Sequence, residues 1–198
     1  AWGELGCVYE QALALLAGRE PGVEPRVRWH PFQLNPDLPR EGIPRSAYLE
    51  AKFGGRERAH GIYERVRAAG RSVGIDFAFD RIERQPNTLD AHRLIAWAQS
   101  SGKGEDVVER LFRAYFLDGR GIGDRAVLAA VAFEAGLDSD AASAMLASDE
   151  GVAEVEATDR RVRELGVTGV PFFIFAGRVA AAGAQEPDTL VEAMTQAL

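Results

Sequence analysis

The sequence has only one cysteine, Cys7, among 198 residues. A single cysteine cannot form a disulfide within the chain, so no internal disulfide framework holds this fold together. Histidine is scarce as well, and its three copies are His30, His60 and His92. Their wide spacing from one another and from Cys7 does not match the ligand spacing of a zinc site, so we expect no metal site.

Long apolar runs and an excess of basic residues are also missing. No run approaches the roughly 18 apolar residues that span a bilayer, and the longest stretches, such as Val170–Ala176, have the length of a strand. The net charge of -7 argues against a broad surface for nucleic acid or anionic membranes, because such surfaces need clustered lysine and arginine. We therefore expect neither nucleic acid nor a membrane as a partner.

What the sequence does have is a hydrophobic content of 46%, which is enough for a packed core and argues against disorder. The spacing of apolar residues predicts a first helix over residues 4–17, with Gly18 just past its end. The alternation of apolar and polar residues over Val27–Phe32 predicts a strand. A proline-rich loop follows over residues 33–45.

Helical patterns then run almost without interruption from residue 46 to residue 165, with N-cap residues at Ser46, at Asn87 or Thr88, and at Asp124. A short extended piece is expected around Phe77 and Phe79. The predicted helices cover residues 46–52, 56–73, 88–100, 104–117, 124–135, 139–147 and 150–165.

The pattern changes again near the end of the chain. Val170–Phe175 predicts a buried strand, Ala176 and Gly177 a turn, and residues 178–182 a returning strand. Pro187 lies where a last helix would begin. Strands near both ends with helices between them indicate one sheet whose middle connection has expanded into a helical subdomain.

Several stretches, in order and over nearly the whole chain, resemble the DsbA-like family of thioredoxin-fold proteins, and FrnE-type oxidoreductases in particular. They are residues 29–36, 48–55, 86–94, 111–116, 166–175 and 183–185. Taken alone, Pro171 could be an ordinary loop proline, because only about 5–6% of X–Pro bonds are cis. The resemblance instead implies a cis bond between Val170 and Pro171.

The resemblance implies an α/β, thioredoxin-like fold with a large all-helical insertion. Residues 1–45 and 166–198 would form the thioredoxin-like domain, and residues 46–165 the inserted helical subdomain. The family carries a first strand and then a Cys-Pro-Trp-Cys motif at the start of the first helix, where the partial positive charge of the helix lowers the pKa of the attacking thiol.

Here the start of the chain, Ala1-Trp2-Gly3, overlies the Pro-Trp-Cys part of that motif. The attacking cysteine and the first strand are then expected just before Ala1, unless the protein has lost both, and Gly3 replaces the resolving cysteine. Cys7 is the alternative nucleophile, although its position in the helix also suits a small packing residue. A trimmed N-terminus would hide a signal peptide, so only the resemblance bears on the compartment, and it favours the cytoplasm.

The resemblance also places Trp2, Val170 and Pro171 beside the reacting thiol and turns the segment with Asn87 and His92 toward the active-site cleft. We therefore expect these five residues to contact the substrate. Both helical residues also suit structural roles: a histidine on an apolar helix face is commonly a hydrogen-bonded core residue, and Asn87 suits a helix cap.

The function implied by the resemblance is thiol–disulfide exchange with protein or small-molecule disulfides. It needs no resident cofactor, with glutathione as a candidate co-substrate, and a homodimer is a further expectation. Two alternatives stay open. One is a glutathione-dependent isomerase or transferase, like the 2-hydroxychromene-2-carboxylate isomerases and kappa-class transferases of the same superfamily, which place a serine where the dithiol begins. The other is a redox-inactive module that binds peptides beside Pro171.

Overall fold

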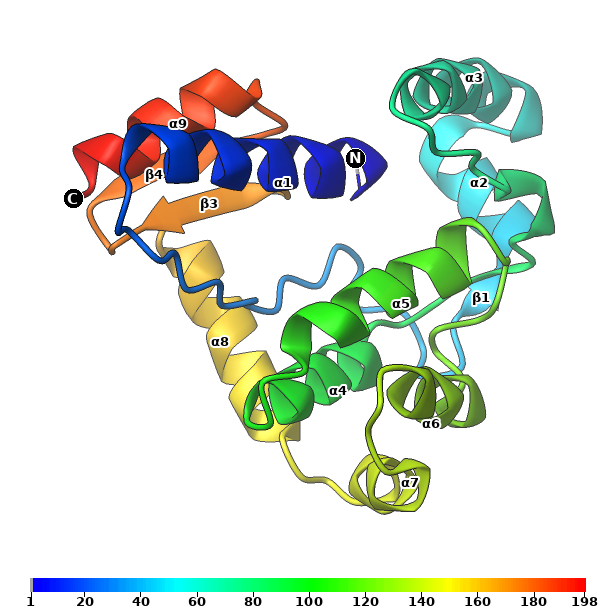
Figure 1. The fold of residues 1–198 in the computed structure, drawn as a ribbon. Helices are drawn as coiled ribbons and strands as arrows, with labels where there is room; N and C mark the ends of the chain where they lie inside the picture. Colours follow the sequence, from blue (N-terminus) through cyan, green and yellow to red (C-terminus); the bar gives the residue numbers. More distant parts are fainter. Residues whose placement is uncertain (1) are drawn as a thin grey trace.

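A computed structural model describes residues 2–198 of the protein, without the side chains of residues 2–10 and of residue 56. Over these residues the chain forms nine helices of the α type and four short strands (Figure 1). In order they are α1 (Trp2–Arg19), β1 (Ile43–Pro44), α2 (Arg45–Phe53), α3 (Arg56–Ser72), the short 3₁₀ helix η1 (Phe79–Arg81), β2 (Arg84–Gln85), α4 (Leu89–Gln99), α5 (Gly104–Phe116), α6 (Arg125–Glu134), α7 (Ser139–Ala147), α8 (Val152–Glu164), β3 (Phe172–Phe175), β4 (Val179–Ala182) and α9 (Pro187–Gln196).

The two ends of the chain meet around the hairpin of β3 and β4 (Figure 1). The strands pair antiparallel, with Phe172 opposite Ala182 and Phe175 opposite Val179. Because side chains alternate along a strand, Phe173 and Phe175 share one face, and there they pack with Ala181 against α1 and α9. The buried residues of this core are Ala12, Leu16, Leu190, Val191 and Met194.

The other face of the hairpin is open to solvent. Ile174 points to that face and is 54% exposed, so the prediction of a strand buried on both sides is wrong. The predicted hairpin itself and its turn at Ala176 and Gly177 are confirmed. Ala176 has a φ of 48°, a left-handed conformation that is unfavourable for a residue with a Cβ atom.

The helices between the two ends enclose a separate core. Leu94, Val107, Leu128 and Leu146 have no exposed surface, and they join α4, α5, α6 and α7 in one cluster. A smaller cluster of Phe77, Phe79, Ile82 and Tyr115 supports the segment that precedes α4. The seven predicted helices are confirmed, because their apolar residues recur at the helical period and bury one stripe. Within the described part of the chain, no helix is long and apolar enough to cross a membrane.

The predicted strand at Val27–Phe32 is wrong, because this segment has no strand partner within the described residues. Side chains from distant helices hold its backbone instead. The N–H of Trp29 donates to Oε1 of Gln99 at 2.8 Å, and Nε2 of Gln99 donates back to the Trp29 carbonyl at 3.1 Å. The N–H of Gln33 donates to Oδ1 of Asp159 at 2.8 Å.

Some helix starts and short elements also differ from the prediction. Ser46 lies inside α2, and Pro44 occupies the N-cap position without a side-chain hydrogen bond. Phe79 begins a 3₁₀ helix instead of lying in an extended piece. The predicted N-cap at Asp124 is confirmed, since its side chain accepts a hydrogen bond from the N–H of Ala126.

Candidate functional site

A hollow of about 290 Å³ lies beside the loop between α8 and β3. The bond between Val170 and Pro171, at its centre, is cis, as the resemblance implies. The hollow is lined by Gly166, Thr168, Gly169, Val170, Pro171, Phe172, Ala182 and Gly183. Most of these residues are small, so the backbone of the loop is accessible to a bound chain.

The loop is held at both ends. Where α8 ends, the N–H of Gly166 donates to the Arg163 carbonyl at 2.9 Å, and Val167 is buried with 3% of its surface exposed. At the other end, the N–H of Gly183 donates to the Pro171 carbonyl at 2.8 Å. Val170 lies between these anchors and is 46% exposed, so it is presented to the solvent by a supported loop.

Among the side chains that the structure describes, none that lines the hollow is charged. A neutral cavity with accessible backbone groups suits the main chain of an extended peptide and a small apolar side chain, since neither leaves a buried charge without a partner. Of the predicted site residues with described side chains, Val170 and Pro171 line this hollow, and Asn87 and His92 do not.

His92 lies on α4 at the junction with α8 and the segment around Phe32. Burial lowers the pKa of His92 to about 4, against the opposing effects of the Asp159 charge and of a hydrogen bond with the Phe32 backbone. Its imidazole is therefore neutral near pH 7. This is the environment of a hydrogen-bonded core histidine.

Asp159 and Arg163 complete this junction from α8. Asp159 is buried, and its Oδ2 accepts a hydrogen bond from Nε of Arg163 at 3.0 Å. The guanidinium group of Arg163 also donates to the Gln33 carbonyl and lies over the Phe32 ring, 4.3 Å from its centroid. Asp159 and Arg163, one helical turn apart on α8, thus bind the N–H and the carbonyl of Gln33.

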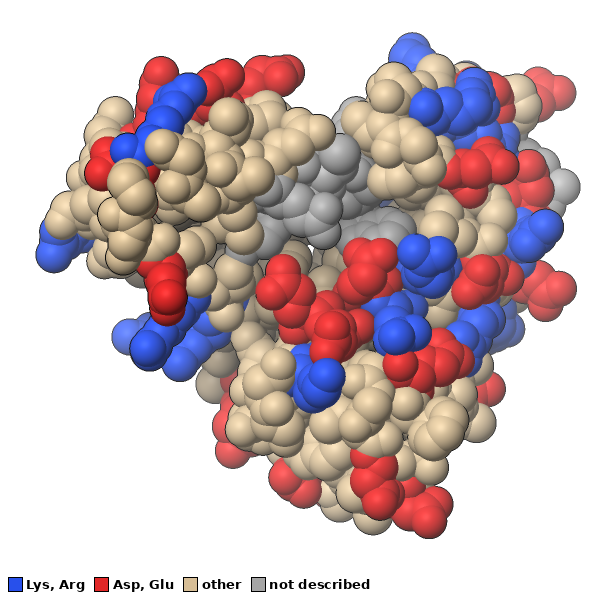
Figure 2. Space-filling model, viewed as in Figure 1, with Lys and Arg blue, Asp and Glu red and all other residues tan. Residues whose placement is uncertain are grey.

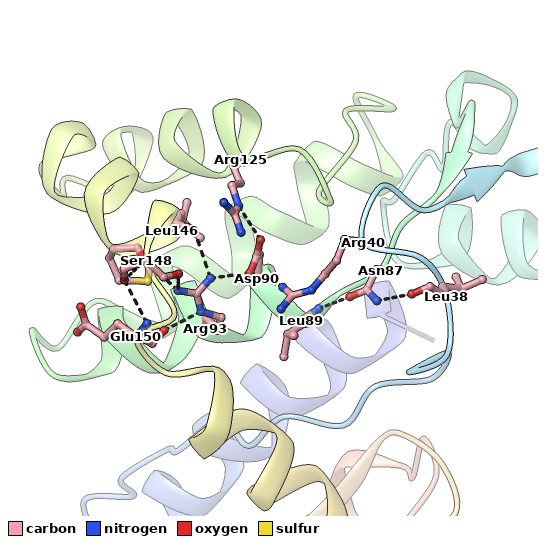
Figure 3. Close-up of polar contacts among 11 residues, drawn as sticks. Leu38, Arg40, Asn87, Leu89, Asp90, Arg93, Arg125, Leu146, Ser148 and Glu150 are labelled. Carbon is pink, nitrogen blue, oxygen red and sulfur yellow. Dashed lines mark hydrogen bonds and ion pairs between the residues drawn. The ribbon is translucent and has the colours of Figure 1, made fainter.

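Asn87 has a structural role, because both polar atoms of its side chain bind backbone groups (Figure 3). It is buried, its Nδ2 donates to the Leu38 carbonyl at 2.7 Å, and its Oδ1 accepts from the N–H of Leu89 at 2.9 Å. Its side chain therefore connects the proline-rich loop to the first turn of α4. Thr88, in the N-cap position, makes no side-chain cap bond.

Arg93, which was not among the predicted site residues, is only 1% exposed. Its guanidinium group donates to the carbonyls of Met145, Ser148 and Glu150 at 2.7 to 2.8 Å and to Oδ1 of Asp90 at 2.6 Å (Figure 3). Asp90 also pairs with Arg40 at 3.1 Å and Arg125 at 2.9 Å. The signal was an arginine four residues after Leu89 and four before Trp97, on the apolar side of a helix.

The predictions at the N-terminus concern side chains outside the described part. Trp2 and Cys7 both lie within α1, whose backbone begins at Trp2, and their side chains are not described. The N-terminal end of α1 points toward α2 and α3 (Figure 1), and α1 and α3 are in contact. A group at the start of α1 would therefore lie between the hairpin and these two helices.

A family model for the DSBA-like thioredoxin domain matches residues 8–195. The chain therefore belongs to the DsbA-like thioredoxin family, and its helix-rich structure with few strands is a DsbA-like thioredoxin fold.

Among solved structures, the chain is similar to a probable DsbA oxidoreductase, SCO1869, from Streptomyces coelicolor. The two are 32% identical with a TM-score of 0.85, over 98% of this chain and 83% of the other. It also shares its fold with a "putative protein disulfide isomerase" from Nitrosomonas europaea, at 19% identity and a TM-score of 0.55, over 71% and 72% of the two chains. The uncharacterized protein YwbO of Bacillus subtilis (strain 168) is 25% identical over 163 residues, which are 80% of this chain and 76% of YwbO.

Proposed function

We propose that this protein is a thiol–disulfide oxidoreductase of the DsbA and FrnE type that accepts an extended substrate chain in the hollow beside Val170 and Pro171. The observation that carries the proposal is the hollow at this loop, which is lined by small residues and by no charged side chain of the described part. It is supported by the 32% identity, over 98% of the chain, to a probable DsbA oxidoreductase.

The reaction we propose begins with the attack of a thiolate on a substrate disulfide. This attack forms a mixed disulfide and releases one substrate sulfur as a thiolate. A second thiolate then attacks the mixed disulfide and releases the other substrate sulfur, so the substrate gains two electrons and the pair of attacking thiols becomes oxidised. The reverse sequence oxidises a substrate dithiol.

We assign the attacking cysteine of this proposal to none of the numbered residues. We expect it just before Ala1, at the start of α1, where the helix dipole favours the thiolate. The packing of α1 against α9 and the hairpin would hold that thiolate in a fixed position. If only one such thiol exists, an external thiol such as glutathione would resolve the mixed disulfide.

The test is an intact mass of the protein purified from its native source, before and after alkylation of the reduced form, followed by an insulin-reduction assay. We expect a mass above that of these 198 residues, at least two alkylated thiols, and an activity that alkylation abolishes. A serine just upstream of Ala1 together with glutathione binding would replace this proposal with the isomerase alternative. Peptide binding without any thiol-dependent activity would replace it with the redox-inactive module.

A further inference from the structure

The helices α2 and α3 carry a charge opposite to that of the whole protein. Residues 45–72 hold seven lysines and arginines and three glutamates, a net charge of +4 in a chain whose net charge is -7. Blue side chains lie over α3 in the upper right of Figure 2, with red side chains beside them. Such a local reversal of sign attracts acidic groups and disfavours basic ones.

Part of this positive charge is used inside the protein. Arg45 donates to Gln85 and Tyr63, and Arg67 pairs with Glu64 and Asp80. These contacts hold α2, α3 and the neighbouring loop together. Arg45 and Arg67 are therefore structural and are not available to a partner.

Arg58 and Arg65 differ, because both are exposed and neither forms an ion pair with any side chain that the structure describes. They lie seven residues apart on α3, which is two helical turns, and so share one face. Ile62 lies between them on the same face and is 36% exposed. In this stripe, which we call the α3 stripe, two arginines without an ion pair among the described side chains flank an apolar side chain.

We propose that the α3 stripe docks an acidic, partly apolar segment of the polypeptide whose disulfide reacts at the start of α1. This substrate class rests on the proposed function: α3 contacts α1, so a chain docked on α3 lies near the helix at whose start the reacting thiol is proposed. Carboxylates of the segment pair with Arg58 and Arg65, and an aliphatic side chain packs on Ile62. The overall charge of -7 repels a long polyanion such as nucleic acid, whereas a short acidic segment meets only the positive lobe.

The test measures binding without redox chemistry. The probe is a short fluorescein-labelled peptide in which glutamates alternate with leucines and which contains no cysteine; its counterpart has glutamine in place of glutamate. We expect the full-length protein to bind the glutamate peptide more tightly, with a Kd that rises several-fold between about 50 mM and about 300 mM salt. Arg58→Glu/Arg65→Glu should weaken this binding about tenfold, since reversing two charges replaces two attractions with two repulsions.

The matched control is Arg160→Glu/Arg161→Glu on α8, where both arginines are exposed. It changes the net charge by the same amount and should weaken binding by less than about twofold, because α8 lies away from α3 (Figure 1). Circular dichroism and the Tm confirm that both variants are folded. An equal loss in the two variants, equal binding of the two peptides, or tighter binding of a single-stranded oligonucleotide would overturn the proposal.

A second readout separates this proposal from the proposed function. In disulfide reduction, the α3 variant should raise KM for an acidic disulfide peptide about tenfold, with kcat and the rate on a neutral peptide unchanged. Absence of all thiol-dependent activity with intact peptide binding would refute the oxidoreductase and leave the docking surface standing. Normal activity with the same KM for both peptides would refute the docking surface alone.

Discussion

The loss of the Arg93 guanidinium group should be the most damaging single change in the helical core. In Arg93→Met, a side chain of similar length keeps much of the packing but removes the Arg93 donor from the carbonyls of Ser148 and Glu150. The Met145 carbonyl keeps its hydrogen bonds from the N–H and the hydroxyl of Ser148. These two contacts are part-buried, so each lost bond costs at the low end of about 1–3 kcal/mol. Removing one charge of a buried pair costs about 3–5 kcal/mol when the partner is left alone, but Asp90 keeps Arg40 and Arg125. We therefore expect a loss of about 3–5 kcal/mol in all.

A loss of this size is a large fraction of the roughly 5–15 kcal/mol that stabilises a domain. The assay is urea unfolding followed by circular dichroism, with the midpoint and slope fitted together. Arg93→Lys restores the charge but not the fork of donors, and should lose about 2–3 kcal/mol. The control is Arg113→Met on α5, an exposed arginine that lies 3.7 Å from Glu109, for which we expect a change below about 0.5 kcal/mol. A loss below about 1.5 kcal/mol in Arg93→Met would show that the carbonyls find other donors and would refute the reasoning.

Three further predictions concern other parts of the molecule. The pKa of His92 falls from 6.5 in the unfolded chain to about 4 in the folded protein, so the stability that the neutral imidazole allows is present above pH 6.5 and is lost as the pH falls toward 4. His92→Gln should therefore flatten the dependence of the unfolding free energy on pH across this range. An unchanged slope would contradict the buried position of the imidazole. Asp159→Asn should lower the pKa of His92 further, because the Asp159 charge raises it. NMR titration of the imidazole measures this change, and a pKa at or above the wild-type value would show that the two groups do not interact. Ala176→Asn should stabilise the hairpin by about 0.5–1 kcal/mol, because asparagine tolerates the φ of 48° better than alanine does, while Ala180→Asn on the neighbouring strand should give no such gain in a thermal melt.

The helices could be predicted from the sequence because their information is local. Each has an apolar stripe at the helical period, and glycine or a capping side chain marks many of their ends, as Asp124 does for α6. The segment Val27–Phe32 failed for the opposite reason. The alternation of apolar and polar residues indicates which side chains share a face, but not which groups the backbone hydrogen-bonds to. Just after this segment, the acceptor for the Gln33 N–H is the carboxylate of Asp159, 126 residues away.

Among the residues of the candidate site, too, those in a local motif could be predicted and those that depend on distant contacts could not. Val170 and Pro171 stand within a contiguous motif, so the resemblance located them and the structure places both at the hollow. Asn87 and His92 were expected to face a substrate, but their polar groups interact with Leu38, Leu89, Phe32 and Asp159. Arg93 was visible as a charge on an apolar stripe, yet its acceptors are carbonyls that only the tertiary fold brings to it.

The helix α8 connects these separate observations. The turn before its first residue, Val152, is held by Arg93 through the carbonyls of Ser148 and Glu150. Its middle holds Gln33 through Asp159 and Arg163, and its last residue, Glu164, lies two positions before Gly166 at the edge of the hollow. One rigid helix is therefore anchored to α4 at its start, to the segment after α1 at its centre, and to the candidate substrate loop at its end. A buried ion pair adds little net stability, so the main effect of these polar contacts is to fix where α8 lies, and with it the loop that carries Val170 and Pro171.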